Sequence, residues 1–153
     1  MRPDPGDEVS GSQSGFDGAV EAYRKALELY VKGDDKRVME FFSRLDDVTL
    51  ANPLGPPVRG PEEVRKVAAA GAAQLRDGSI RAFEEVSRYS TSDLGYVVQI
   101  ERAQAKLGGS EDTSPIALRV TMIFRREGDT WRVVHRHADP ITTPRPISTT
   151  IES

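Results

Sequence analysis

The pattern of hydrophobic and polar residues changes at Ser79. Before this residue, apolar side chains recur every three or four positions, which is the period of a helix with one buried side. After it, apolar and polar residues alternate, which is the period of a strand with one buried face. The sequence therefore predicts an α+β fold in which helices come first and a run of sequential antiparallel strands follows.

Three helices are predicted, over residues 16–31, 34–45 and 61–77. The third begins with Pro61, which suits the first position of a helix because the first amides have no partner within it. Gly78 is expected to end it, since glycine commonly follows the last turn of a helix. The second helix is the shortest, and its apolar side is expected to be buried.

Five strands are predicted, over residues 47–51, 80–89, 96–107, 116–126 and 131–138. Three prolines between residues 52 and 57 end the first strand, because proline has no amide proton to donate to a sheet. The last two strands flank Gly128-Asp129, which has the residue types of a two-residue hairpin turn. The chain is thus expected to end in a long antiparallel hairpin.

Strict alternation divides this hairpin into two faces. One is mainly apolar and includes His135 and His137, and the other is mixed and includes Arg119, Thr121 and Arg136. One face is expected to meet the helices and the other a second subunit. A shift of one residue in the pairing would exchange side chains between the faces.

The length of 153 residues fits one domain with a sizeable core. Residues 1–15 are rich in Gly, Ser, Pro and Asp and are predicted to form a flexible leader, because they offer little apolar surface to bury. Residues 16–140 form the predicted domain. Residues 141–153 contain two prolines and are predicted to be an extended or mobile tail.

Charge and composition exclude several classes of function. The net charge of -3 gives no electrostatic reason for binding nucleic acid or an anionic membrane. The chain has no cysteine, and therefore no disulfide, thiol nucleophile or thiolate metal site. No apolar run resembles a secretory signal or approaches the length of a membrane span. A cytoplasmic protein is predicted.

The order of these elements resembles the nuclear transport factor 2-like superfamily, and most closely its SnoaL-like proteins. The resemblance spans residues 16–140 and rests on the turn at 52–55, the helix start at 60–63 and the last strands at 128–137. It implies a cone, in which the three helices pack on a strongly curved, mostly antiparallel sheet, with a pocket in the open end. This scaffold includes enzymes, binding proteins and association modules alike.

The resemblance also bears on one reaction. In ketosteroid isomerase, the turn that matches Asn52 carries a carboxylate base, and an amide cannot take up that proton at neutral pH. The family's oxyanion-stabilising tyrosine aligns near Ala26, with Tyr23 and Tyr30 on neighbouring turns. The steroid isomerase mechanism is therefore not expected. Asn52 either donates a hydrogen bond to a ligand or caps its own turn.

The candidate catalytic residues are His135 and His137, which lie two apart on a strand and could transfer protons. Alternatively, they are core or interface histidines. No third ligand is recognisable nearby, so neither a metal site nor a cofactor is predicted. Arg119 and Arg136, with Thr121 beside them, could hold a carboxylate or a developing oxyanion. The arginines could equally form cross-strand ion pairs with Glu84, Glu85 or Glu101.

Three functions remain open at this point. The first is a small-molecule pocket protein that acts as a lyase, isomerase or cyclase on a carbonyl compound, with a histidine moving the proton. The second is a non-catalytic protein that binds a carboxylate metabolite through Arg119 and Arg136. The third is a dimerisation or association module. A homodimer is expected, without a nucleic acid or membrane partner, and a solution mass above that of a dimer would favour the association module.

Overall fold

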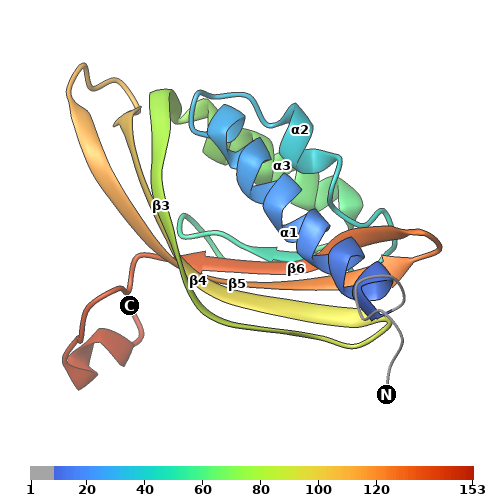
Figure 1. Ribbon diagram of the computed structural model, residues 1–153. Helices are drawn as coiled ribbons and strands as arrows, with labels where there is room; N and C mark the ends of the chain where they lie inside the picture. The colour runs from blue at the N-terminus through green and yellow to red at the C-terminus, as the bar shows by residue number, and fades with distance from the viewer. Residues whose placement is uncertain (1–8) are drawn as a thin grey trace.

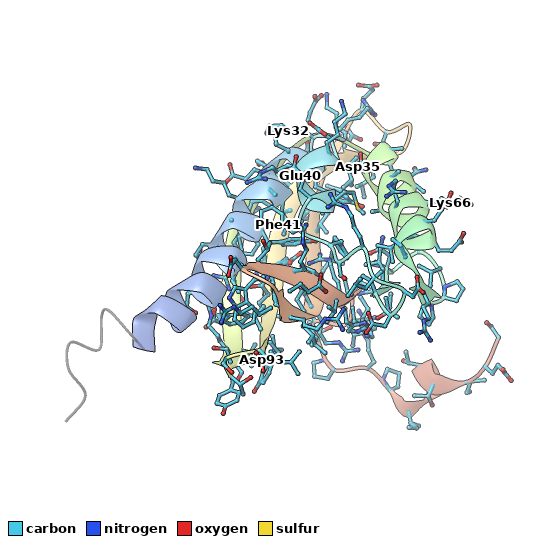
Figure 2. The ribbon with its side chains drawn as sticks, turned by 90° about the vertical axis from the view of Figure 1, so that its right-hand side faces the viewer. Lys32, Asp35, Glu40, Phe41, Lys66 and Asp93 are labelled. Atoms are coloured by element: carbon cyan, nitrogen blue, oxygen red, sulfur yellow. The ribbon has the colours of Figure 1, made fainter. Side chains whose placement is uncertain are left out.

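The computed structural model of the protein describes residues 9–153 and has the predicted α+β class. Its α-helices lie on one side of a strongly curved sheet (Figure 1). The helical elements are α1 (Val9–Tyr30), α2 (Lys36–Met39), α3 (Pro61–Ala73) and a short 3-10 helix, η1 (Ile147–Thr150). Figure 2 shows α1 and α3 as separate helices, with α2 at one end of them.

The sheet has six strands in the order β2-β1-β6-β5-β4-β3. Their bounds are β1 (Thr49–Ala51), β2 (Val58–Arg59), β3 (Leu75–Ser90), β4 (Leu94–Leu107), β5 (Thr113–Glu127) and β6 (Thr130–Asp139). All neighbouring pairs are antiparallel except β1 and β6. The expected curved, mostly antiparallel sheet is therefore confirmed. Strand β2 was not predicted, and it shows that the proline-containing turn closes a short hairpin with β1.

Two predicted helix ends are wrong. The second helix is a single turn that ends at Met39, because the next residues pair with β6 instead: Phe41 accepts a backbone hydrogen bond from Val133, which in turn accepts one from Ser43. Leu45 is consequently exposed. The third helix ends at Ala73, and Gly78 lies in β3. A Cβ atom at Gly78 would lie 2.3 Å from the Val31 carbonyl oxygen, so this glycine permits a close approach of β3 to the end of α1.

The predicted leader differs from the structure in its second half. Residues 1–8 lie outside the described part of the chain, and helix α1 already includes residues 9–15. Gly15 approaches Trp131 closely, since an added Cβ would lie 2.9 Å from the indole nitrogen. At the other end, the tail after Pro140 projects away from the domain (Figure 1). Among the described helices, none is long and apolar enough to cross a membrane.

Aromatic side chains from α1 and the last hairpin form one end of the core. The Phe16 ring meets the rings of Phe124 and Trp131 edge to face, at centroid distances of 5.5 and 5.4 Å. It also lies against Gly95 of β4, where a Cβ would be 2.5 Å from the ring. Helix α3 presents Val64, Ala68 and Ala72 to the interior. Small residues on this helix allow it to lie close to its neighbours.

The terminal hairpin has the predicted turn but not the predicted faces. Glu127 pairs with Thr130 across Gly128-Asp129, and Gly128 has a positive φ of 65°. Further along, Phe124 pairs with Val133 whereas Ile123 pairs with His135, so Val134 is an extra residue, a β-bulge.

The bulge reverses the alternation of β6 beyond it. Arg136 pairs with Met122 and shares its buried face, whereas His137 pairs with Thr121 on the opposite, outer face. His135 lies on the outer face as well, opposite Ile123. The prediction that placed the histidines with the apolar side chains of β5, and Arg136 with Arg119, is therefore wrong.

Candidate functional site

The helices and the inner face of the sheet enclose a cavity of about 500 Å³. Its exposed lining residues, which include Pro53, Leu54 and Leu107, mark the mouth. Its buried lining residues, which include Glu101 and Arg136, mark the inner end. Most of the wall is apolar. A cavity of this size and character suits a small organic molecule.

A buried ion pair lies at the inner end. Arg136 of β6 donates from both terminal nitrogens to Glu101 of β4, at 2.9 Å to Oε2 and 2.8 Å to Oε1. Both side chains are less than 10% exposed. Burial disfavours the charged guanidinium, but the Glu101 carboxylate outweighs this effect and raises the pKa of Arg136. Arg136 therefore stays charged beside the Glu101 carboxylate.

Tyr23 of α1 supplies a hydroxyl group next to this pair. The Arg136 guanidinium lies 5.7 Å from the centre of the Tyr23 ring. No hydrogen bond joins the hydroxyl to another described residue, and no fully buried side-chain oxygen of the described residues lacks a partner. The hydroxyl is therefore accessible from the cavity that Tyr23 lines. Burial raises the pKa of Tyr23, so the group remains a neutral donor.

Tyr30 and Asn52 form a second polar group in the wall. The Tyr30 hydroxyl donates to the Ala68 carbonyl oxygen at 2.8 Å. It lies above Gly71 of α3, where a Cβ would be 2.5 Å from the hydroxyl oxygen and 3.5 Å from the Asn52 amide nitrogen. Burial raises the pKa of Tyr30, and the Arg136 charge and the Asn52 amide oppose this rise. The Tyr30 hydroxyl and the Asn52 amide are therefore both uncharged at physiological pH.

The predicted site residues are divided between the two faces of the sheet. Asn52 and Arg136 line the cavity. Arg119, Thr121, His135 and His137 lie on the outer side, away from it. The alternative of an ion pair with Glu84, Glu85 or Glu101 holds for Arg136, which pairs with Glu101. Arg119 also forms an ion pair, at 2.6 Å, but with Asp139, which was not among the expected partners.

The histidines have partners on the outer face. His135 Nδ1 is 2.7 Å from the Thr49 hydroxyl, and His137 Nε2 is 2.9 Å from an Asp139 carboxylate oxygen. Partial burial, together with the nearby His137, lowers the pKa of His135. Within residues 9–153, no group of three or more His, Cys, Asp or Glu side chains is placed to hold a metal ion.

Two functional candidates were not among the predicted site residues. Glu101 follows from the alternation of β4, whose buried face also carries Val97, Gln99 and Ala103. A carboxylate on such a face indicates a paired or functional group, because charged side chains are rarely buried without a partner. Tyr23 shares its helix face with Phe16, Val20 and Leu27, so its sequence pattern alone resembles that of an ordinary core residue.

Comparisons with known proteins agree with this architecture. The sequence profile of a family described as the SnoaL-like domain matches residues 20–142. No functionally curated protein matches the chain. A protein from Streptomyces avermitilis, provisionally named a dehydratase of the nuclear transport factor 2-like family, has a similar structure with a TM-score of 0.70. It is 20% identical, and the match covers 88% of this chain and 99% of that chain.

Two further solved structures are similar. A ketosteroid isomerase-like protein from Erwinia carotovora atroseptica is 18% identical, with 85% of this chain and 96% of that chain covered and a TM-score of 0.69. A provisionally named calcium/calmodulin-dependent protein kinase type II association domain from Thiobacillus denitrificans is 26% identical. That match covers 82% of this chain and 94% of the other, with a TM-score of 0.61. The three names differ, so they support the fold rather than one activity.

Proposed function

The chain belongs to the SnoaL-like domain family, and from this premise we propose that its cavity binds an uncharged, mainly apolar small molecule that carries a carbonyl group. The observation that carries this proposal is the Tyr23 hydroxyl, which lines a mainly apolar cavity and forms no hydrogen bond with another residue of the described part of the chain. A neutral hydroxyl donates one hydrogen bond, and a carbonyl oxygen is its simplest acceptor. The apolar walls accommodate the remainder of the ligand.

The same geometry argues against a carboxylate ligand. Arg136 already donates to Glu101 with both terminal nitrogens, so its charge is compensated within the protein. An incoming carboxylate would have to displace Glu101 or lie beside it, and both outcomes place like charges together in a poorly solvated space. Arg119, the other candidate, lies on the outer face.

A proton transfer beside the ligand carbonyl is the reaction that the cavity supports best. Tyr23 would stabilise negative charge on the carbonyl oxygen. Glu101 is a carboxylate near it, and its Oε1 accepts one hydrogen bond, from Arg136, which leaves capacity for another. A carboxylate in such a position can accept the proton next to a carbonyl, as an isomerase, lyase or cyclase requires. Histidines on the outer face would take no part in this step.

Binding is tested with four related probes: naphthalene, 2-acetylnaphthalene, 2-naphthol and 2-naphthoate. We expect 2-acetylnaphthalene to bind more tightly than naphthalene and 2-naphthoate to bind most weakly. The Tyr23→Phe variant should lose about 3- to 10-fold in affinity for the ketone, the value of one neutral hydrogen bond, and nothing for naphthalene. Tyr89→Phe is the matched control, because Tyr89 is exposed. Equal loss for both probes, or preferred binding of naphthoate, would refute the proposed ligand class.

Turnover is measured separately, as exchange of the methyl protons of 2-acetylnaphthalene for deuterium in heavy water. The wild-type protein should accelerate this exchange, and Glu101→Gln should return it to the rate in buffer. Binding by the variant is measured in parallel, because a catalytic residue affects rate beyond affinity. If the wild-type protein binds the ketone but exchange stays at the rate in buffer, the protein is a binding protein that does not catalyse this proton transfer.

We also propose that the protein forms a homodimer through the outer face of the sheet. Helices α1, α2 and α3 all lie on the other side of the sheet in Figure 1. Apolar side chains such as Val98, Ile100 and Ile123 are only partly buried there. Two arginines of this face are already paired within the chain, Arg119 with Asp139 and Arg102 with Glu84. A face with compensated charges and partly exposed apolar groups suits contact with a second copy.

A further inference from the structure

The buried side-chain amide of Gln99 holds the carboxylate of Glu101, which lines the cavity. Gln99 lies on the same face of β4 as Glu101, and its side chain is fully buried. Its amide nitrogen donates to Glu101 Oε2 at 2.9 Å. Its carbonyl oxygen accepts from Arg24 of α1, at 3.0 Å from Nε and 2.6 Å from Nη2. Gln99 thus connects Glu101 in the cavity wall to Arg24 of α1.

The chemistry of the two neighbours fixes the orientation of this amide. Arg24 has donors only, so it must meet the Gln99 oxygen. The amide nitrogen then necessarily points at Glu101, which as a carboxylate has acceptors only. Oε2 of Glu101 is occupied by both Gln99 and Arg136, whereas Oε1 accepts from Arg136 alone. Oε1 is therefore the oxygen with capacity for a ligand.

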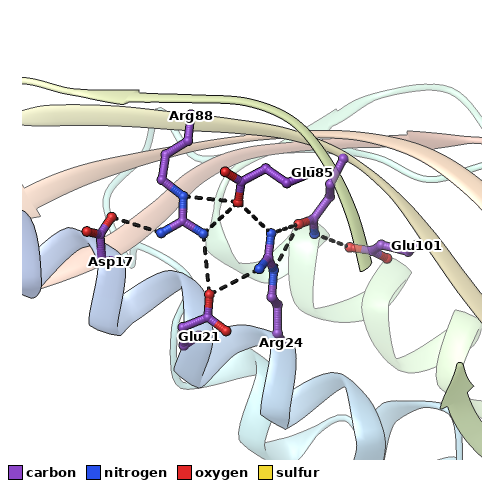
Figure 3. Close-up of polar contacts among 7 residues, drawn as sticks. Asp17, Glu21, Arg24, Glu85, Arg88 and Glu101 are labelled. Atoms are coloured by element: carbon purple, nitrogen blue, oxygen red, sulfur yellow. Dashed lines mark hydrogen bonds and ion pairs between the residues drawn. The ribbon is translucent and has the colours of Figure 1, made fainter. Parts of the chain in front are cut away.

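Arg24 is itself held by charged groups near the surface. It pairs with Glu21 at 3.0 Å and with Glu85 at 2.9 Å. Arg88 contacts the same two carboxylates and also Asp17, at 2.8 Å (Figure 3). These ion pairs join α1 to β3. The Arg24 side chain is only 13% exposed, so its position has little freedom.

We propose that Gln99 and Arg24 are positioning residues for the ligand site: they hold the Glu101 carboxylate in one orientation and keep Oε1 available to the ligand. This inference rests on the proposed function of the cavity. Neither residue touches the ligand; Gln99 acts through Glu101, and Arg24 acts through Gln99. Arg136 of β6 and Tyr23 of α1 are the charged and titratable groups that face Glu101 directly. Beyond Gln99 lie Arg24 of α1 and Glu85 of β3.

Gln99→Glu is the decisive variant, because it keeps the size and the acceptor for Arg24 but replaces the N–H donor with a second carboxylate oxygen. When one of the two carboxylates holds a proton, the original hydrogen bond is reproduced. When both are ionised, they repel each other and Glu101 leaves its position. Catalysed deuterium exchange by this variant, relative to wild type, should therefore fall about 10-fold as the pH rises from about 5 to 8.

A residue that only fills space would give no such pH signature, so Gln99→Met should lower relative exchange equally at both ends of this range. Arg24→Gln should lower it as well, because it releases the Gln99 amide to rotate. The matched control is Arg102→Gln, which breaks the ion pair with Glu84 on the outer side of β4. A pH profile of Gln99→Glu parallel to that of wild type would overturn the proposal.

A second readout does not need a ligand. The carbon-13 resonance of the Glu101 side-chain carboxyl, assigned by its absence in Glu101→Gln, should titrate at higher pH in Gln99→Glu than in wild type. If this shift appears while no probe binds and no exchange occurs, the positioning role holds and the proposed function fails. If the resonance titrates as in wild type, the positioning role is wrong whatever the probes do.

Discussion

At the scale of single residues, the pair of Arg136 and Glu101 bears on both the stability of the protein and the proposed function of its cavity. It places two charges at the inner end of an apolar cavity, and each is satisfied by the other. Replacing one partner leaves an uncompensated buried charge, whereas replacing both removes the cost of desolvation as well as the attraction. The pair is thus a feature of the site rather than a requirement for folding.

Arg136→Met is predicted to lower the free energy of unfolding by about 3–5 kcal/mol, because it leaves the Glu101 carboxylate buried without its partner. The double variant Arg136→Met with Glu101→Leu should recover most of this loss. Urea denaturation, with the midpoint and slope compared, measures both. Arg119→Met is the control and should change little, since that arginine is exposed. A double variant no more stable than the single one would contradict this interpretation.

His135 makes stability depend on pH. Its pKa in the folded protein lies below the ordinary value of 6.5 because partial burial and the nearby His137 disfavour the charged ring. The unfolded chain therefore binds a proton first as the pH falls below 6.5, so the folded state loses stability towards acid and gains it towards pH 6.5. Above that value the contribution is constant.

The His135→Gln variant is predicted to flatten this part of the pH profile of the unfolding free energy. The titration of the His135 ring, followed by NMR, gives the direction of the shift directly. Carboxylates whose pKa is lowered by ion pairs, such as Asp139 beside Arg119, affect the unfolding free energy at more acidic pH. The acidic part of the pH profile should therefore have the same slope in the variant as in the wild type. A His135 pKa at or above 6.5 would show that the ring is more solvated than the structure indicates.

At the scale of elements, alternation predicted where most strands lie but not which side of β6 faces inward. Val133 and Val134 are adjacent and both apolar, so the sequence has no signal for which of them is the extra residue. The bulge moved Arg136 to the inside and both histidines to the outside. Gly78 is a related case, because a glycine needed for close approach in a strand has the same sequence signal as one that ends a helix.

Single cysteines introduced along β6 test the bulge directly, because the natural chain has none. Cysteines at positions 133 and 138 should resist a water-soluble thiol reagent, and a cysteine at position 137 should react quickly. Regular alternation would instead make 133 and 137 alike and 138 different. Reaction rates measured by mass spectrometry therefore distinguish the two arrangements, and matching rates at 133 and 137 would contradict the bulge.

At the scale of the whole molecule, the order of elements and the α+β class could be predicted from the sequence because each rests on local periodicity. The candidate site could be predicted only in part. Asn52 lies in a recognisable turn, but Tyr23 and Glu101 lie 78 positions apart and meet only because the sheet curves around α1. Curvature arises from bulges and twist over many residues, which short sequence patterns do not encode.

The proposed dimer makes a prediction at this scale. Ile123→Lys on the outer face should convert a dimer into a monomer in sedimentation experiments, because a lysine charge cannot be buried there without a partner. Affinity for 2-acetylnaphthalene should be unchanged, since the side chain is on the far side of the sheet from the cavity. Leu54→Lys, at the cavity mouth, is the control and should leave the mass unaltered. A monomeric wild type would contradict the assembly.

The most direct test of the central claim is a crystal structure of the protein with 2-acetylnaphthalene. We expect the aromatic rings to occupy the apolar cavity and the ketone oxygen to accept a hydrogen bond from the Tyr23 hydroxyl, next to the intact pair of Arg136 and Glu101. A probe bound elsewhere, or one in the cavity with its ketone directed to the mouth at Leu54, would contradict it.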